Sequence, residues 1–136
     1  MKVGLTHPDT FFCQDKQVAS KFKGIQVWHD DKNIFGYQVL YEADRVGHHL
    51  GKELNPCARK EGFELTENEI VTRVTAYHSN VMHRLEFETS AGRVISFGGQ
   101  AEPNYESKSF IFSENESLHS LKGGFGGHLH NLELII

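Results

Sequence analysis

One loop-to-strand pattern occurs three times in the chain, and this repetition constrains the fold more than any other sequence feature. Each copy has the spacing apolar-x-x-apolar-x-apolar: Ile34, Tyr37 and Val39, then Met82, Leu85 and Phe87, then Leu129, Leu132 and Leu134. The third copy belongs to the closing stretch GGFGGHLHNLELII. Internal repetition is typical of a fold built from one repeated unit. It also marks one equivalent position, the residue after the first apolar residue: Phe35, His83 and His130.

Alternating apolar and polar residues, rich in β-branched and aromatic types, predict strands along most of the chain. The predicted strands are residues 24–28, 34–42, 71–77, 82–89, 93–97 and 109–112, with a last strand at the end of the chain. Residues 123–127, which contain four glycines, are expected to form a loop, and only residues 64–71 hint at a helical turn. We therefore expect a single all-β domain, residues 1–136, built as a sandwich, barrel or prism.

Composition excludes several classes of partner. The 136 residues carry a net charge of −4 without a basic stripe, so nucleic acid is not an expected partner. No apolar run approaches membrane-spanning length, and no secretory signal is recognisable, which favours a cytoplasmic location if the chain is complete. Cys13 and Cys57 are too few for a disulfide scaffold; two free thiols and a single bridge both stay open.

The polar residues do not form a catalytic or metal-binding pattern. Asp30 and Asp31 are typical of a hairpin turn, and nothing marks a nucleophile elbow. His128 and His130 lie two apart on a predicted strand and point to the same side, but a zinc site needs three or four ligands. We therefore expect no enzyme activity, no metal and no cofactor.

Three stretches together resemble the jacalin-like lectin domain, over about residues 25–136. They are GIQVWHDDKNIFGYQVLY, NEIVTRVTAYHSNVMHRLEFETSAGRVISFGG and SFIFSENESLHSLKGGFGGHLHNLELII, in the order and spacing of that family's three units. The resemblance implies a β-prism of three antiparallel four-stranded sheets related by pseudo-threefold symmetry. It also implies a lectin, which is a carbohydrate-binding module.

The resemblance also implies a set of site residues. In the family a monosaccharide lies between an N-terminal glycine-rich loop and the loop before the last strand, where backbone N–H groups and an Asp bind it. The matching positions are Gly126, Gly127 and His128 for the loop, with Gly127 and His128 as backbone donors, and His130 in place of the Asp. His128 or Phe125 is expected against the sugar face, although Phe125 fits equally well in the end of the prism.

Two departures from the family pattern bear on this site. A neutral imidazole at position 130 offers one acceptor nitrogen, whereas a carboxylate offers two charged oxygens. Residues 1–10 contain only Gly4 where the family has a pair of glycines. A candidate second site lies in the equivalent loop of the middle unit, at His78, Asn80 and His83.

Two functions follow from these observations. The first is a carbohydrate-binding module with a remodelled site, in which His130 accepts from the sugar and the partner is a glycan or glycoprotein. The alternative is a protein-interaction or assembly module of the same fold that has lost sugar binding, whose partner is another protein or a second copy of the chain.

Overall fold

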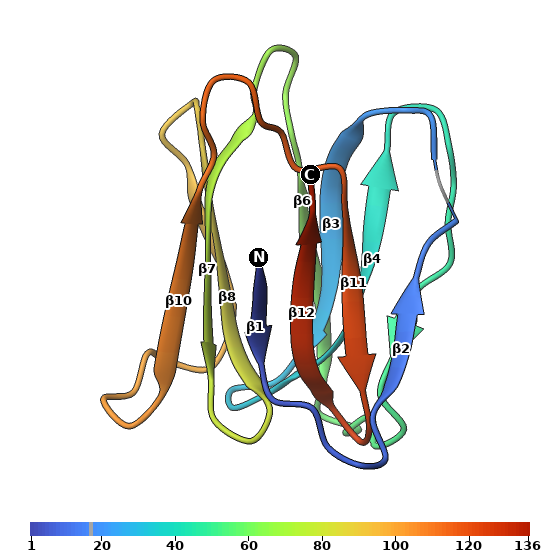
Figure 1. Cartoon of the computed structure of the whole chain (residues 1–136), viewed down its shortest axis with the longest axis vertical. Coiled ribbons are helices and arrows are strands. Elements are labelled where there is room, and N and C mark those ends of the chain that lie inside the picture. The colour runs from blue at the N-terminus through green and yellow to red at the C-terminus, as the bar shows by residue number, and fades with distance from the viewer. Residues whose placement is uncertain (17) are drawn as a thin grey trace.

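The computed structural model describes residues 1–16 and 18–136, and its twelve strands form three antiparallel four-stranded sheets (Figure 1). Sheet A has the order β1 (Lys2–Gly4), β12 (Leu129–Ile135), β11 (Ser120–Phe125) and β2 (Phe11–Gln14). Sheet B has the order β5 (His49–Leu50), β4 (Ile34–Tyr41), β3 (Phe22–His29) and β6 (Arg59–Glu64). Sheet C has the order β10 (Glu106–Ile111), β7 (Val71–His78), β8 (Met82–Thr89) and β9 (Val94–Gly98). The predicted all-β prism of three sheets is confirmed.

The sequence-based predictions differ from the structure in a few segments. Strands β1, β2, β5 and β6 were not predicted, because they are short or polar. Residues 64–71 form no helix; they contain the end of β6, a turn and the start of β7. Gly123 and Gly124 belong to strand β11 rather than to a loop. A β-carbon on Gly124 would lie 2.5 Å from the side-chain amide of Asn131, so this glycine leaves room for a cross-strand neighbour.

The inward faces of the three sheets meet in one hydrophobic core. The repeated apolar residues supply much of it, because alternate residues of a strand point to the same face. Tyr37, Leu85 and Phe87 are completely buried, and Leu132 is almost so. The hydroxyl of Tyr37 donates to the backbone carbonyl of Leu121 at 3.1 Å, which satisfies a polar group inside this core. The described residues contain no helix with the length and apolarity needed to cross a membrane.

Each central hairpin contains a β-bulge at the position that the repeat marks. In the pairing of β3 with β4, β7 with β8 and β11 with β12, one residue of the second strand has no partner. These unpaired residues are Phe35, His83 and His130. A bulge redirects the side chain of the extra residue and bends the strand. The residue before each bulge can therefore point into the core while the bulged residue turns toward the end of the prism.

One end of the prism, the apex, carries the loops β1–β2, β3–β4, β5–β6, β7–β8, β9–β10 and β11–β12 (Figure 1, lower end). This follows from the topology, because each of these loops joins a strand that ends at the apex to an antiparallel strand that begins there. The three bulges lie beside these loops. The apex is therefore where side chains from all three sheets come together.

The opposite end is held by one buried carboxylate, Glu69, in the β6–β7 loop. Its side chain is 1% exposed and accepts from Arg93 at 2.6 and 2.8 Å and from the hydroxyl of Thr89 at 2.5 Å. The backbone N–H of Thr66 donates to it at 2.9 Å. Hydrogen bonds from Arg93 first, then Thr89 and Thr66, hold the pKa of Glu69 far below its ordinary 4.5. The ionised carboxylate thus joins the β6–β7 loop to the β8–β9 hairpin.

We expect Glu69→Gln to lower the free energy of unfolding at neutral pH. The amide is uncharged and has a single oxygen, so it cannot accept charge-assisted hydrogen bonds from both Arg93 nitrogens. The stabilisation by the wild-type carboxylate is fully present above pH 4.5 and is lost as the pH falls through the lowered pKa of the folded state. Urea unfolding at about pH 7 and about pH 3 should therefore show a difference between the two proteins that shrinks in acid. Glu67→Gln, a change at an exposed neighbour, is the control. A difference that is equally large at both pH values would contradict this role.

Candidate functional site

The β11–β12 loop, Gly126 to His128, is a tight turn at the apex. The N–H of Gly126 donates to the carbonyl of His128 at 3.0 Å, so Gly127 lies at the tip. The β5–β6 loop contacts this turn directly, and the β1–β2 loop contacts His130, which follows it in β12.

The β5–β6 loop binds both carbonyl groups of this turn. The N–H of Lys52 donates to the carbonyl of Gly126 at 2.8 Å, and the N–H of Glu53 donates to the carbonyl of Gly127 at 2.9 Å. In a trans peptide the N–H points opposite to the C=O. The N–H groups of Gly127 and His128 therefore point away from the β5–β6 loop. Within the described part of the chain neither has a hydrogen-bond acceptor, and both residues are partly exposed.

The β1–β2 loop contains a four-residue turn, His7-Pro8-Asp9-Thr10. The N–H of Thr10 donates to the carbonyl of His7 at 3.0 Å, and the N–H of His7 donates to the hydroxyl of Thr10 at 2.8 Å. Pro8 occupies the second position of the turn, where its fixed φ is favourable. The turn is thus internally braced.

His130 connects this turn to the β11–β12 loop. Its Nδ1 lies 2.9 Å from the hydroxyl of Thr10, and its ring packs edge-on against that of His7 with 4.5 Å between centroids. A β-carbon on Gly126 would lie 2.6 Å from Nε2 of His130, so the imidazole occupies the space above a glycine. The bulge and this glycine together let a ring that is only 7% exposed fit between two loops.

Burial determines the protonation state of His130. Burial first, and then the nearby His7, lower its pKa from the ordinary 6.5, against a smaller opposite effect of Asp9. The Thr10 hydroxyl accepts from the N–H of His7 and also forms a hydrogen bond with Nδ1 of His130. Nδ1, which the sequence-based hypothesis left open to a sugar, is thus hydrogen-bonded within the chain.

Phe125 lies in the core, which corrects its assignment to the sugar face. The side chain is completely buried between Phe11 and Tyr37, with ring centroids 5.8 and 6.0 Å away. The pairing of Phe125 with Leu129 turns both side chains inward. His128 is partly exposed and packs on Phe35, the bulged residue of sheet B, with 4.9 Å between ring centroids.

Comparison with known proteins agrees with this architecture. The family model "Jacalin-like lectin domain" matches residues 2–135. The chain belongs to the jacalin-like lectin domain family. Lectins are carbohydrate-binding proteins that are not enzymes. A search of curated proteins by sequence finds no match.

Solved structures show the same fold for this lectin domain at low sequence identity. The prostate-specific WGA16 glycoprotein lectin, form II, is 14% identical with a TM-score of 0.79, covering 96% of this chain and 93% of its own. The artocarpin–mannopentose complex is 21% identical with a TM-score of 0.74, covering 98% and 95%. The jacalin–T-antigen complex is 17% identical with a TM-score of 0.74, covering 91% and 96%.

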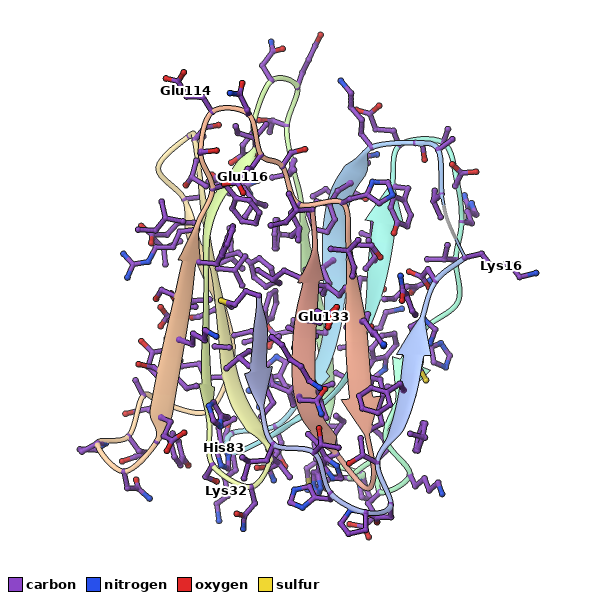
Figure 2. All side chains as sticks on the ribbon, viewed as in Figure 1. Lys16, Lys32, His83, Glu114, Glu116 and Glu133 are labelled. Carbon is purple, nitrogen blue, oxygen red and sulfur yellow. The ribbon has the colours of Figure 1, made fainter. Side chains whose placement is uncertain are left out.

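The candidate second site of the lectin domain lies in sheet C, around the bulged His83. Figure 2 shows His83 beside Lys32 at the apex. Nδ1 of His83 lies 2.7 Å from the carbonyl of Lys32 and must donate to it, which leaves Nε2 to accept from the hydroxyl of Ser79 at 2.5 Å. The ring also stacks on Tyr105, with 4.1 Å between centroids. Both ring nitrogens of His83 are therefore hydrogen-bonded within the chain, and Tyr105 covers one face of the ring.

The other two residues of that candidate site have different partners. His78 lies with Nε2 3.6 Å from the carboxylate of Glu106. Asn80 accepts a hydrogen bond at its backbone carbonyl from Nε2 of His7 at 2.8 Å. Asn80 thus helps to hold the β1–β2 loop, and the structure joins part of the second candidate site to the first.

The described residues contain no group of three or more His, Cys, Asp or Glu side chains that could hold a metal ion. Cys13 is partly buried and Cys57 is exposed, and both are free thiols.

Sequence reasoning did not identify the residues that surround the β11–β12 loop. They are His7, Asp9 and Thr10 in the β1–β2 loop, and Lys52 and Glu53 in the β5–β6 loop. A signal was present for the first group, because His-Pro-Asp-Thr is a favourable turn sequence. Lys52 and Glu53 act through their backbone N–H groups, which leave no mark in the sequence.

We expect an NMR titration to give His130 a pKa below 6.5, because the lectin domain buries its ring. As the pH falls through the lowered pKa, both ring nitrogens become donors, so the Thr10 hydroxyl can then only accept from Nδ1. The amide signals of residues 7–10 should shift over the same range. Thr10→Val, which removes the hydroxyl, should abolish that coupled shift. A pKa at or above 6.5 would contradict the buried position.

Proposed function

We propose that this domain binds a glycan at the apex of sheet A, between the β1–β2 and β11–β12 loops. The observation that carries the proposal is the pair of successive N–H groups of Gly127 and His128, which have no acceptors in the described residues and belong to partly exposed residues. Sugar hydroxyl oxygens accept from such groups, and two adjacent donors match two adjacent hydroxyls. The carbonyls of the same peptides are held by Lys52 and Glu53, so these donors are oriented before a ligand arrives.

The sugars bound by proteins of similar structure support a sugar as the ligand class. These proteins include artocarpin with mannopentose, mannotriose and methyl-α-mannose, a mannose-binding lectin from champedak, and jacalin with T-antigen. The low identity of these proteins leaves the particular sugar to experiment. Mannose-terminated and galactose-terminated glycans are therefore both included in the test.

His130 has a positioning role in this proposal. Its Nδ1 is engaged by Thr10 and its ring by His7, so it attaches the β1–β2 loop to the β11–β12 loop. It replaces the family Asp in position without reproducing the two acceptor oxygens of a carboxylate. His128, partly exposed on Phe35, presents a ring beside the two donors. Gly126 supplies the space that His130 fills.

The contacts of His83 argue against extending the proposal to sheet C. Both ring nitrogens are hydrogen-bonded within the chain, and Tyr105 covers one face of the ring. A sugar there would have to displace these partners. We therefore propose one site for the domain, at sheet A.

We expect His128→Pro to weaken glycan binding about two- to twelvefold relative to His128→Ala, as for one lost hydrogen bond of ~0.5–1.5 kcal/mol. Both variants lose the imidazole, and only proline also loses the N–H. A glycan array identifies the sugar, and titration calorimetry with the corresponding free methyl glycoside measures affinity. Thermal unfolding of both variants checks that the hairpin is intact.

Equal affinities of the two folded variants would show that the His128 N–H is not a donor. A wild-type domain that binds no glycan on the array would contradict the proposal. That result would favour the alternative of a protein-interaction or assembly module, whose partner is a protein or a second copy of the chain.

A further inference from the structure

The proposed sugar site has two backbone donors but needs an acceptor for the protons of the sugar hydroxyls. His130 is poorly placed to provide one, because its Nδ1 is hydrogen-bonded to Thr10, its Nε2 lies against Gly126, and the residue is buried. Two exposed carboxylates, Asp9 and Glu53, flank the β11–β12 loop. The orientation of the peptide groups distinguishes between them.

Glu53 lies on the side of the carbonyls. Its N–H binds the carbonyl of Gly127, and a β-carbon on Gly127 would lie 2.6 Å from Oε2 of Glu53. The free N–H groups of Gly127 and His128 point the opposite way, because each belongs to a trans peptide whose C=O faces the β5–β6 loop. A sugar bound by these N–H groups therefore lies on the far side of the loop from the Glu53 backbone.

Asp9 lies in the loop on that far side. It is the third residue of the braced turn from His7 to Thr10, which is attached to His130 through the Thr10 hydroxyl and the His7 ring. Asp9 is exposed, and its carboxylate has no hydrogen bond or ion pair among the described residues. It is also near enough to His130 for its negative charge to raise the pKa of that imidazole. A free carboxylate is thus carried by a loop that is attached to His130, two residues along the chain from the His128 donor.

We propose that Asp9 is the carboxylate that binds the sugar hydroxyls in this domain, supplied by the β1–β2 loop instead of the β11–β12 loop. A hydroxyl would donate its proton to Asp9 while its oxygen, or that of its neighbour, accepts from Gly127 or His128. The ligand class is a neutral sugar with two adjacent hydroxyls, since an anionic group would be repelled by Asp9. This inference rests on the proposed function, and it deepens it by naming the acceptor.

This assignment gives His130 a reason for its position. With a carboxylate already delivered by Asp9, an Asp at position 130 would place a second negative charge in the same small site. The imidazole instead attaches the loop that carries Asp9. The turn closed by Thr10 and Pro8 limits the motion of Asp9, which reduces the entropy lost when a sugar binds.

The test compares Asp9→Asn, Glu53→Gln and Glu102→Gln with the wild-type domain. Glycans ending in mannose, galactose, N-acetylglucosamine and sialic acid are immobilised, and methyl α-mannoside and methyl α-galactoside are titrated in solution. We expect Asp9→Asn to weaken binding about tenfold or more, since it removes the charge from a charge-assisted hydrogen bond. Glu102→Gln, in the exposed β9–β10 loop, is the matched control and should keep wild-type affinity. Neutral termini should bind better than sialylated ones.

Each outcome is informative. Wild-type binding that Asp9→Asn retains would overturn the assignment of Asp9 and leave the proposed function standing. A loss caused by Glu53→Gln but not by Asp9→Asn would place the acceptor on the other side of the loop and overturn it as well. Absence of any glycan binding by the wild-type domain would overturn the proposed function itself. Amide NMR spectra of Asp9→Asn establish that the turn at residues 7–10 is retained.

Discussion

The β-bulge in the three central hairpins is the constraint on which the apex depends. Without an extra residue, strict alternation from Leu132 would turn His130 into the core and Leu129 away from it. The bulge lets Leu129 point into the core while His130 turns to the apex loops. The same displacement at Phe35 and His83 gives the apex its three equivalent positions. Each then has its own partners: His128 on Phe35, Tyr105 on His83, and the β1–β2 turn on His130.

Backbone hydrogen bonds determine the conformation of the β11–β12 loop. Lys52 and Glu53 use their N–H groups to hold the two carbonyls of the Gly126–Gly127 segment, and peptide planarity then orients the remaining donors. Glycine permits this close approach, because a β-carbon on Gly51 would overlap the carbonyl of Gly127.

The longer strands of the fold were predictable from the sequence because their periodicity is strong. Residues 34–42 and 82–89 coincide closely with β4 and β8, where apolar residues alternate over eight positions. The short strand β5 and the polar strand β6 carry no such signal, because their pairing depends on neighbours distant in sequence. The glycines at 123 and 124 indicated a loop by residue type, yet they lie in β11, where Asn131 and Phe125 occupy the space beside them. The importance of position 130 was visible in the repeat, whereas its contact with Thr10, 120 residues away, was not.

By itself, the sequence determined the all-β class, the threefold repetition and the positions of the three bulged residues, because local periodicity encodes which face of a strand is apolar. It also carried enough of the family pattern to indicate a lectin domain. Only the tertiary structure decided which groups meet at the apex: Phe125 became core, His83 lost its free nitrogens, and His130 became the attachment point of a loop carrying Asp9. These outcomes depend on contacts between loops of different strands and sheets, and the sequence of one segment does not specify which distant segment packs against it.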